Sequence, residues 1–150
     1  LLMKVIGIAA ITIDGFIARH SLEKMTWSKD LSLFKNQTLN HTVIMGSNTK
    51  KTLPVELEKR QSIVVHREDD PKAILDKIKG EKCFIIGGGR TFSKFSEYLT
   101  HLYLTPHPLI FGEGIKLFES LDKKIKLKFE KQVPVLPNEG IFQLQFGIKH

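Results

Sequence analysis

Two glycine-containing turns in this sequence could bind an anionic ligand. The stretches VIMGSNT (43–49) and IIGGGRT (85–91) each place glycine between an apolar run and polar residues. Glycine lets the backbone approach a phosphate closely, and the first N–H groups of a helix point at a bound anion. A third apolar run ends in His66 and Arg67. The carboxyl ends of parallel strands lie at one edge of a sheet, so we expect these turns to meet and bind a ligand with several phosphates.

The glycines alone are weak evidence, because a tight strand-to-helix turn explains them equally well. Asp30 is a separate candidate for chemistry, within a helix that we predict over residues 28–40 with Ser28 as its N-cap. The apolar stripe of this helix consists of Leu31, Phe34 and Leu39. Asp30 either complements the helix dipole or lies in an apolar cleft, where desolvation would raise its pKa.

The composition is that of an ordinary globular domain. The chain has 150 residues, enough for one domain over residues 1–150 with a sizeable core. No apolar run approaches the roughly 20 residues that span a bilayer. The opening Leu1-Leu2-Met3 resembles the start of a first strand or an appended segment rather than a signal peptide. The single Cys83 cannot form an internal disulfide, which favours a buried thiol and a cytoplasmic protein.

The net charge of +7 is compatible with an anionic partner. The densest basic cluster is DKKIKLKFEK (122–131), in which Ile125, Leu127 and Phe129 alternate with Lys124, Lys126 and Lys128. This period of two predicts a half-buried strand whose lysines face water, with a polyanion site as the alternative. No nucleic-acid motif is present, and we expect neither a nucleic-acid nor a membrane partner. The histidines lack metal-ligand spacing, so we expect no metal.

The order of the apolar runs and helix signals predicts an α/β fold. Buried strands are expected over 3–13, 42–46, 62–66 and 82–87, alternating with helices over 28–40, 47–53, 70–80 and 91–99. The third helix has Asp70 as its N-cap, Pro71 in its first turn and Gly80 at its end. Strands over 101–110, 124–133 and 141–149 follow. We therefore expect a mostly parallel central sheet with antiparallel edge strands and about four flanking helices.

Taken together, these stretches resemble dihydrofolate reductase. The resemblance is carried by IAAITIDGFIA (8–18), MTWSKDLSLFKNQTLNHTVIMGSNT (25–49), LEKRQSIVVHR (57–67) and IIGGGRTFSKFSEYLTHLYLT (85–105). It covers residues 5–105 almost without gaps, with a short deletion between Trp27 and Asp30. It implies that family's fold and the NADPH-dependent reduction of 7,8-dihydrofolate, with hydride transfer to C6 and protonation at N5. A monomer or a homodimer is expected.

The resemblance also implies roles in binding the substrate. Asp30 would hydrogen-bond to the pteridine ring and favour protonation at N5, while Trp27 would hold an ordered water beside the ring. Thr105 would hydrogen-bond to Asp30 and fix its orientation. Arg60 would bind the α-carboxylate of the glutamate tail, although a surface arginine is the alternative. The apolar residues expected to line the substrate pocket are Ile8, Ala9, Leu31, Phe34, Leu53 and Ile86.

The cofactor side is implied in the same way. The expected cofactor-binding residues are Ala10, Ile17, Gly46, Ser47, Asn48, Thr49, His66, Arg67, Ile86, Gly87, Gly88, Gly89, Arg90, Thr91 and Phe92. Ser47 stands where the family often has an arginine that contacts the adenosine 2′-phosphate. Arg67 and Arg90 would supply that charge instead, so we expect NADPH rather than NADH. Gly87-Gly88 matches a cis peptide of the family.

The segment TPHPLIFGEGIKLFESL (105–121) departs from the reductase pattern. It resembles a P-x-x-x-G-x-G-x-x-L-F segment in a sister family, which reduces the ribosylamino-diaminopyrimidinone phosphate of riboflavin biosynthesis with NADPH. Asp30, Phe34 and Arg60 suit a pterin with a glutamate tail, whereas a ribose phosphate would need another anion site such as Lys50 or Lys51. A non-catalytic nucleotide-binding module is the third hypothesis.

Overall fold

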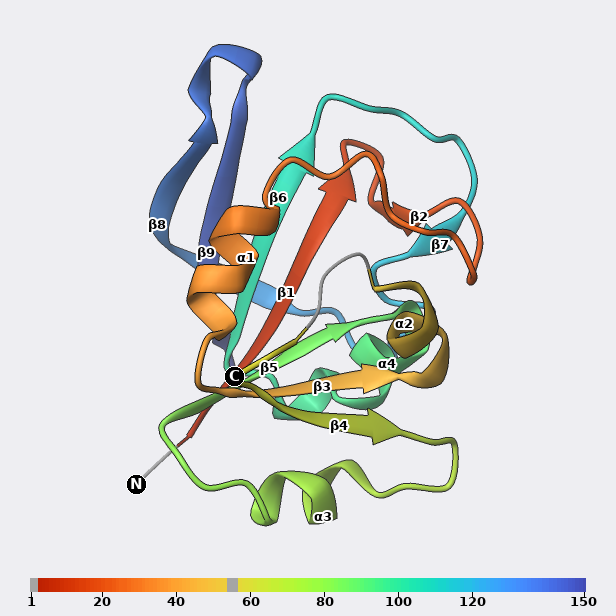
Figure 1. Ribbon diagram of the computed structural model, residues 1–150, viewed down its shortest axis with the longest axis vertical. Coiled ribbons are helices and arrows are strands. Elements are labelled where there is room, and N and C mark those ends of the chain that lie inside the picture. The colour runs from red at the N-terminus through yellow and green to blue at the C-terminus, as the bar shows by residue number, and fades with distance from the viewer. Residues whose placement is uncertain (1–2, 54–56) are drawn as a thin grey trace.

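The computed structural model describes residues 3–53 and 57–150, which form an α/β fold around one large sheet. In this part of the chain the sheet has seven strands, in the order β4-β3-β5-β1-β6-β9-β8 (Figure 1). The first five are parallel to one another, whereas β9 is antiparallel to β6 and β8. The strands are β1 (Lys4–Thr12), β3 (Thr42–Gly46), β4 (Gln61–Val65), β5 (Lys82–Gly87), β6 (His101–His107), β8 (Lys126–Leu136) and β9 (Ile141–Lys149). The predicted fold class is confirmed.

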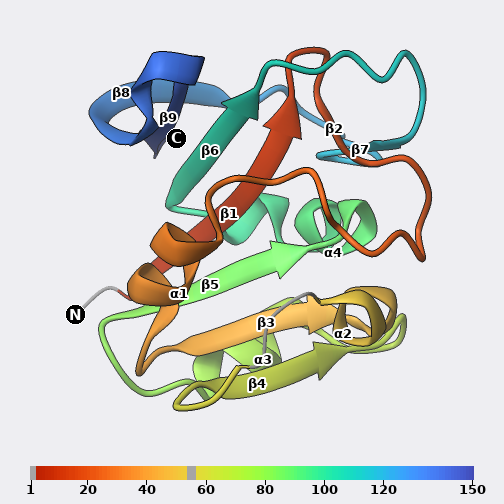
Figure 2. The same cartoon turned by 45° about the horizontal axis from the view of Figure 1, so that its top comes forward.

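The central strands are apolar on both faces because side chains pack against both faces of the sheet. One cluster joins Ile44, Ile85 and Leu102 to the region of α3 (Pro71–Asp76) and α4 (Gly89–Lys94). The other joins Ile6, Val43, Met45 and Phe84 to Phe34 of α1 (Leu31–Thr38). Figure 2 shows α1 in front of the sheet and α3 behind it. This two-sided burial explains why these strands read as continuous apolar runs.

The first helix begins later than predicted. It starts at Leu31 rather than at residue 28, and Asp30 occupies the N-cap position without a side-chain cap hydrogen bond. Ser28 is buried and is not the cap, so that prediction is wrong. The backbone N–H of Lys29 donates to His107 of β6 at 2.9 Å, which ties the chain to the sheet just before the helix begins. Leu39 ends the helix and is 40% exposed, so it is not part of the apolar stripe.

The other helices follow the predictions with shifted ends. Helix α2 (Ser47–Thr52) follows β3 directly, as expected. The Asp70 carboxylate accepts from the N–H of Ala73 at 3.3 Å, which confirms the predicted cap, but α3 ends at Asp76 rather than near Gly80. The fourth helix is interrupted: α4 ends at Lys94, and a 3₁₀ turn, η1 (Ser96–Tyr98), completes the segment. A second 3₁₀ turn, η2 (Pro137–Glu139), joins β8 to β9.

A small second sheet was not predicted. It pairs β2 (Phe16–Ala18) with β7 (Ile115–Lys116) in antiparallel fashion, and no strand was predicted over β7. The carboxylate of Asp14 supports this region by accepting from the backbone N–H groups of Phe111 and Gly112. The hydrogen bond from Thr12, followed by those from the backbone, holds the pKa of Asp14 below its usual value. The 105–121 segment is therefore attached to the start of the chain.

The remaining expectations concern the ends of the chain and its surface. The expectation that Leu1 and Leu2 begin the first strand lies outside the described residues, and β1 itself begins at Lys4. In β8 the lysines face water as predicted, but Phe129 is 57% exposed rather than half-buried. Cys83 is fully buried, and burial raises the pKa of its thiol to about 12. Among the described residues, no helix is both long and apolar enough to cross a membrane.

Candidate active site

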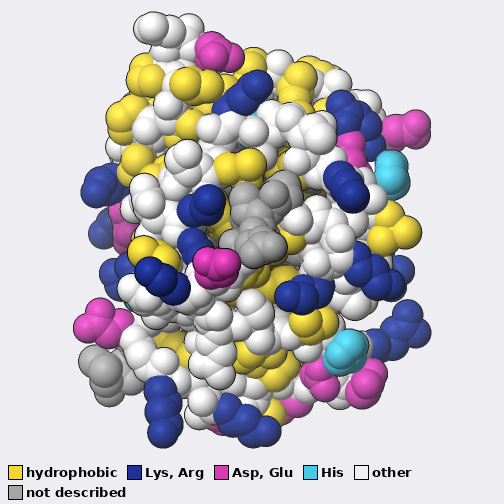
Figure 3. All heavy atoms as spheres, in the orientation of Figure 1, with side chains coloured by type: hydrophobic (Ala, Val, Ile, Leu, Met, Phe, Trp, Pro, Cys, Tyr) yellow, Lys and Arg dark blue, Asp and Glu magenta, His cyan; other side chains and the backbone are white. Residues whose placement is uncertain are grey.

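A cleft of about 1100 Å³ lies at the carboxyl ends of β3, β4 and β5 and extends along β1. The predicted substrate-side residues that line it are Ile8, Ala9, Asp30, Leu31, Phe34, Leu53 and Ile86. The predicted cofactor-side residues that line it are Ala10, Ile17, Gly46, Ser47, Asn48, Thr49, His66, Arg67, Gly87, Gly88, Gly89, Arg90, Thr91 and Phe92. The fold thus brings together segments that are far apart in the sequence. Figure 3 shows that Lys and Arg side chains are prominent on this side of the molecule.

Asp30 is an acid in largely apolar surroundings. It is only 7% exposed and stands immediately before α1. Burial raises the pKa of its carboxyl group, while the nearby Thr105 hydroxyl acts in the opposite direction. The Thr105 hydroxyl is itself buried and makes no hydrogen bond of standard geometry among the described residues, so its predicted hydrogen bond to Asp30 stays a prediction. The cleft interpretation of Asp30 is the one that the geometry favours.

Trp27 and Thr105 lie behind the cleft rather than in its lining. The Trp27 ring is 9% exposed and meets the His107 ring edge-on, with 5.3 Å between the ring centroids. Phe111 makes a similar contact with Trp27 at 5.4 Å. Within the described residues the indole Nε1 of Trp27 is buried and has no hydrogen-bond partner. Buried polar atoms of this kind usually bind ordered water or a ligand.

The two glycine turns pack against each other. A Cβ on Gly46 would lie 2.9 Å from Oγ1 of Thr91, and a Cβ on Gly87 would lie 3.2 Å from Oγ1 of Thr49. The peptide between Gly87 and Gly88 is cis, in agreement with the resemblance to dihydrofolate reductase. A larger residue at Gly46 or Gly87 would therefore crowd the opposite turn. This is one reason for glycine at these positions, and close approach of a ligand would be another.

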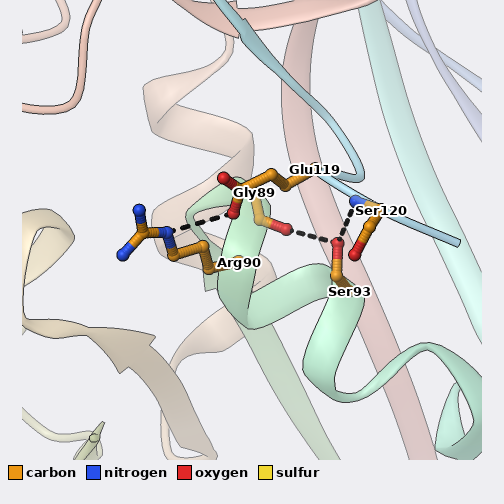
Figure 4. A network of polar contacts seen from close by, with 5 residues as sticks. All are labelled: Gly89, Arg90, Ser93, Glu119 and Ser120. Atoms are coloured by element: carbon orange, nitrogen blue, oxygen red, sulfur yellow. Dashed lines mark hydrogen bonds and ion pairs between the residues drawn. The ribbon is translucent and has the colours of Figure 1, made fainter. Parts of the chain in front are cut away.

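Helix α4 is held from behind by the segment that follows β7 (Figure 4). Arg90 Nε donates to a carboxylate oxygen of Glu119 at 3.1 Å, and the N–H of Glu119 donates to the carbonyl of Gly89 at 3.2 Å. Ser93 Oγ donates to the same carbonyl and accepts from the N–H of Ser120. Figure 4 shows the two terminal nitrogens of Arg90 pointing away from Glu119. The Glu119 carboxylate therefore binds Arg90 through Nε and not through the two terminal nitrogens.

Arg60 lies outside the cleft. Its Nε donates to Oγ1 of Thr38 at 2.9 Å, and its terminal nitrogens donate to the carbonyls of Lys35 and Glu58. It borders a separate groove of about 560 Å³. The structure therefore fixes Arg60 at the end of α1 and does not bring it to Asp30.

Sequence reasoning missed two parts of the cleft. His20, Ser21, Glu23 and Met25 come from the irregular segment after β2, and Lys116 and Glu119 come from the 105–121 segment. Neither part has a periodic pattern, and each reaches the cleft through long-range packing. The described residues contain no group of three or more side chains that could hold a metal ion.

The fold and the cleft define an α/β protein with a ligand site at the carboxyl edge of a mostly parallel sheet. The family model described as dihydrofolate reductase matches residues 4–124, so the chain belongs to the dihydrofolate reductase family. This is a family of NADP-dependent oxidoreductases. The resemblance inferred from the sequence motifs is confirmed.

Relatives within the family differ in the substrates that they are named for. Dihydrofolate reductase of Bacillus subtilis (strain 168) is 33% identical over 106 residues, which cover 63% of this chain. Dihydromethanopterin reductase of Methylorubrum extorquens is 28% identical over 92 residues, which cover 61% of this chain. The matched regions span 62% and 67% of the lengths of these two relatives. Family membership therefore leaves the substrate open.

Two solved structures share the fold at low sequence identity. A dihydrofolate reductase from Enterococcus faecalis, complexed with NADP(H), has a TM-score of 0.76 at 21% identity and covers 98% of this chain and 97% of its own. A putative riboflavin biosynthesis protein from Shewanella sp. PV-4 has a TM-score of 0.66 at 19% identity and covers 99% of this chain and all of its own. A dihydrofolate reductase and a putative riboflavin biosynthesis protein therefore both have this fold.

Proposed function

We propose that this protein reduces 7,8-dihydrofolate to tetrahydrofolate with NADPH. The observation that carries this proposal is Asp30, a buried carboxyl group in a cleft that also contains two glycine turns and two arginines. Family membership and the relative from Bacillus subtilis support it. In this reading the substrate ring lies beside Asp30, and the cofactor lies along the ends of β3 and β5.

The residues of the cofactor side fit NADPH. The turns at 46–49 and 87–91 expose bare backbone and hydroxyl groups to the cleft, and Arg67, Arg90 and Lys94 add positive charge. We propose that Arg67 and Arg90 meet the adenosine 2′-phosphate in place of the arginine that Ser47 replaces. NADPH, when bound, supplies the hydride that is transferred to C6.

Asp30 would then act on the substrate ring. Its carboxylate would accept hydrogen bonds from the 2-amino group and a ring nitrogen, and its negative charge would favour protonation at N5. The apolar side chains of Ile8, Leu31 and Phe34 would exclude water and strengthen this effect. The unpartnered Nε1 of Trp27 supports its proposed role in holding a water beside the ring.

We also propose that Arg60 binds the glutamate tail from its place at the end of α1. A guanidinium group carries five N–H donors, and Arg60 makes three hydrogen bonds to protein groups. Among the described residues its remaining donors have no protein partner, so we propose that they bind a carboxylate. These protein contacts would hold the guanidinium in place and reduce the entropy that binding must remove.

One observation favours a second candidate, the reductase of riboflavin biosynthesis. The 105–121 segment has that family's motif, and it packs against α4 through Gly89 and Glu119. We rank this candidate second because Asp30 and Phe34, which suit a pterin ring, both line the cleft. A non-catalytic module ranks third.

The test is NADPH consumption measured with three substrates under identical conditions. These substrates are dihydrofolate, dihydromethanopterin and the ribosylamino-diaminopyrimidinone phosphate. The proposal predicts turnover with dihydrofolate at the highest kcat/KM and its inhibition by a 2,4-diaminopyrimidine antifolate. Turnover of only one of the other two would replace the proposed substrate, and NADPH binding without any turnover would favour the non-catalytic module.

A further inference from the structure

His107 is a buried histidine that the proposed chemistry does not use. It ends β6 and is 1% exposed. Its Nδ1 lies 2.8 Å from the carbonyl oxygen of Thr105, and its Nε2 accepts from the backbone N–H of Lys29 at 2.9 Å. A carbonyl only accepts and a backbone N–H only donates, so Nδ1 carries the proton and Nε2 is bare. Both partners together fix a neutral imidazole in one orientation.

The hydrogen bond to Lys29 is placed where it can control Asp30. Residues 19–30 form no helix or strand, and Lys29 immediately precedes Asp30. On the other side of Ser28, the Trp27 ring packs edge-on against the same imidazole. One side chain of the sheet therefore contacts the irregular segment at two points, both shortly before the start of α1.

We propose that His107 is a positioning residue that sets the orientation of the Asp30 carboxyl group through its hydrogen bond to the backbone of Lys29. This inference rests on the proposed function, in which Asp30 acts on the substrate. It also gives a role to the unusual T-P-H-P sequence at 105–108, because an apolar residue at 107 would leave the Lys29 N–H without this partner.

His107 does not itself exchange protons with Asp30 in this arrangement. The unprotonated Nε2 already accepts a hydrogen bond from the Lys29 N–H. The proton on Nδ1 points to the main-chain carbonyl of Thr105. Protonation of Nε2 would replace the acceptor with a donor and break the contact with Lys29. His107 therefore acts through the backbone and is not a catalytic residue.

Two substitutions separate the two hydrogen bonds. His107→Gln places an amide oxygen near the position of Nε2 and keeps an acceptor for Lys29. His107→Asn places an amide nitrogen near the position of Nδ1 and keeps only the donor to Thr105. We expect H107Q to retain kcat within about threefold and H107N to lose about tenfold or more, with KM for NADPH unchanged in both. Thermal melting of both variants serves as the control for folding.

A second readout uses the free protein and needs no turnover. Selective ¹³C labelling of aspartate follows the titration of Asp30 by NMR, and Trp27, the single tryptophan, reports on the packing of its ring through fluorescence. H107Q should match the wild type, while H107N should move the pKa of Asp30 and the emission of Trp27. If both variants match the wild type, or change only in proportion to their loss of stability, the positioning role is wrong.

These readouts distinguish failure of the inference from failure of the proposed function. If the wild-type protein does not reduce dihydrofolate, the proposed function fails, and the NMR and fluorescence measurements still decide whether His107 positions Asp30. If the wild type is active and H107N retains its kcat and its Asp30 titration, the inference fails alone.

Discussion

At the scale of single residues, the buried carboxyl group of Asp30 lowers the stability of the folded protein at neutral pH, and the same group is proposed to act on the substrate. Its carboxyl group is desolvated in the fold, and its pKa is raised above the ordinary value of 3.8. Between that value and the higher folded value, the unfolded chain releases its proton first, so stability is lost as the pH rises. A buried acid that weakens the fold at neutral pH is typical of a functional position.

Asp30→Asn should therefore have opposite effects on stability and activity. The amide carries no charge, so the variant should melt at a higher temperature than the wild type at neutral pH, and this advantage should vanish below the ordinary pKa. Hydride transfer to dihydrofolate should slow by about a hundredfold or more at neutral pH. Melting curves across pH and stopped-flow measurement of NADPH oxidation test both effects. Asp122→Asn, at an exposed position, is the matched control, and full activity of D30N would contradict the role of Asp30.

Local chemistry indicated the glycines of both turns, whereas the local sequence left two interpretations of Asp30 open and the family resemblance selected the cleft. All of these residues line the cleft, and their roles stay predictions. The position of Arg60 at the end of α1 depends on side-chain placement across distant segments. The contact between His107 and Lys29 joins residues 78 apart in the sequence, which no local pattern reveals.

At the scale of elements, the pair of β2 and β7 supports the cofactor side of the cleft. Gly114 has a φ of +147°, and a Cβ there would lie 2.3 Å from the carbonyl oxygen of Ala18. Gly89 approaches the same region, because its Cβ would lie 2.6 Å from the carbonyl oxygen of Lys116. These close approaches connect the first residues of α4 to β7 and through β7 to β2.

Gly114→Ala should consequently weaken cofactor binding from outside the cofactor turns. The added methyl group would push β7 away from β2 and loosen the contacts of Glu119 with Gly89 and Arg90. We expect the Kd for NADPH, measured by fluorescence titration, to rise about fivefold or more. Gly112→Ala is the control, because Gly112 also has a positive φ, +79°, but its Cβ would meet nothing within 4 Å. Equal effects of the two substitutions would show that backbone strain alone is responsible.

Periodicity predicted which elements exist, but not where they end. The alternation of strands and helices was confirmed, since burial on both faces of the sheet gives continuous apolar runs. The predicted start of α1 was wrong, since Asp30 and not Ser28 occupies the N-cap position. The strands β2 and β7 have three and two residues, so only their pairing across about a hundred positions defines them.

At the scale of the whole molecule, the positive charge should assist the binding of an anionic cofactor. The chain carries a net charge of +7, and Arg67, Arg90 and Lys94 lie around the cofactor side of the cleft. Solvent-exposed charges are screened as ionic strength rises. The Kd for NADPH should therefore increase several-fold between low and high salt. NADH, which lacks the 2′-phosphate, should show a smaller salt dependence, and equal dependences would argue against recognition of that phosphate.

The overall fold does not choose between the candidate substrates. Solved structures of a dihydrofolate reductase and of a putative riboflavin biosynthesis protein both align with nearly the entire chain. The choice rests on a few side chains, Asp30 above all, and therefore has to be made by chemistry.

The most direct measurement is the fate of a deuterium atom carried at the transferred position of NADPH. The protein would be incubated with this cofactor and an equal mixture of dihydrofolate and the ribosylamino-diaminopyrimidinone phosphate, and the products analysed by mass spectrometry and NMR. We expect one deuterium at C6 of tetrahydrofolate and none in the other product. Deuterium in the reduced ribosylamino compound, with dihydrofolate unchanged, would contradict this expectation.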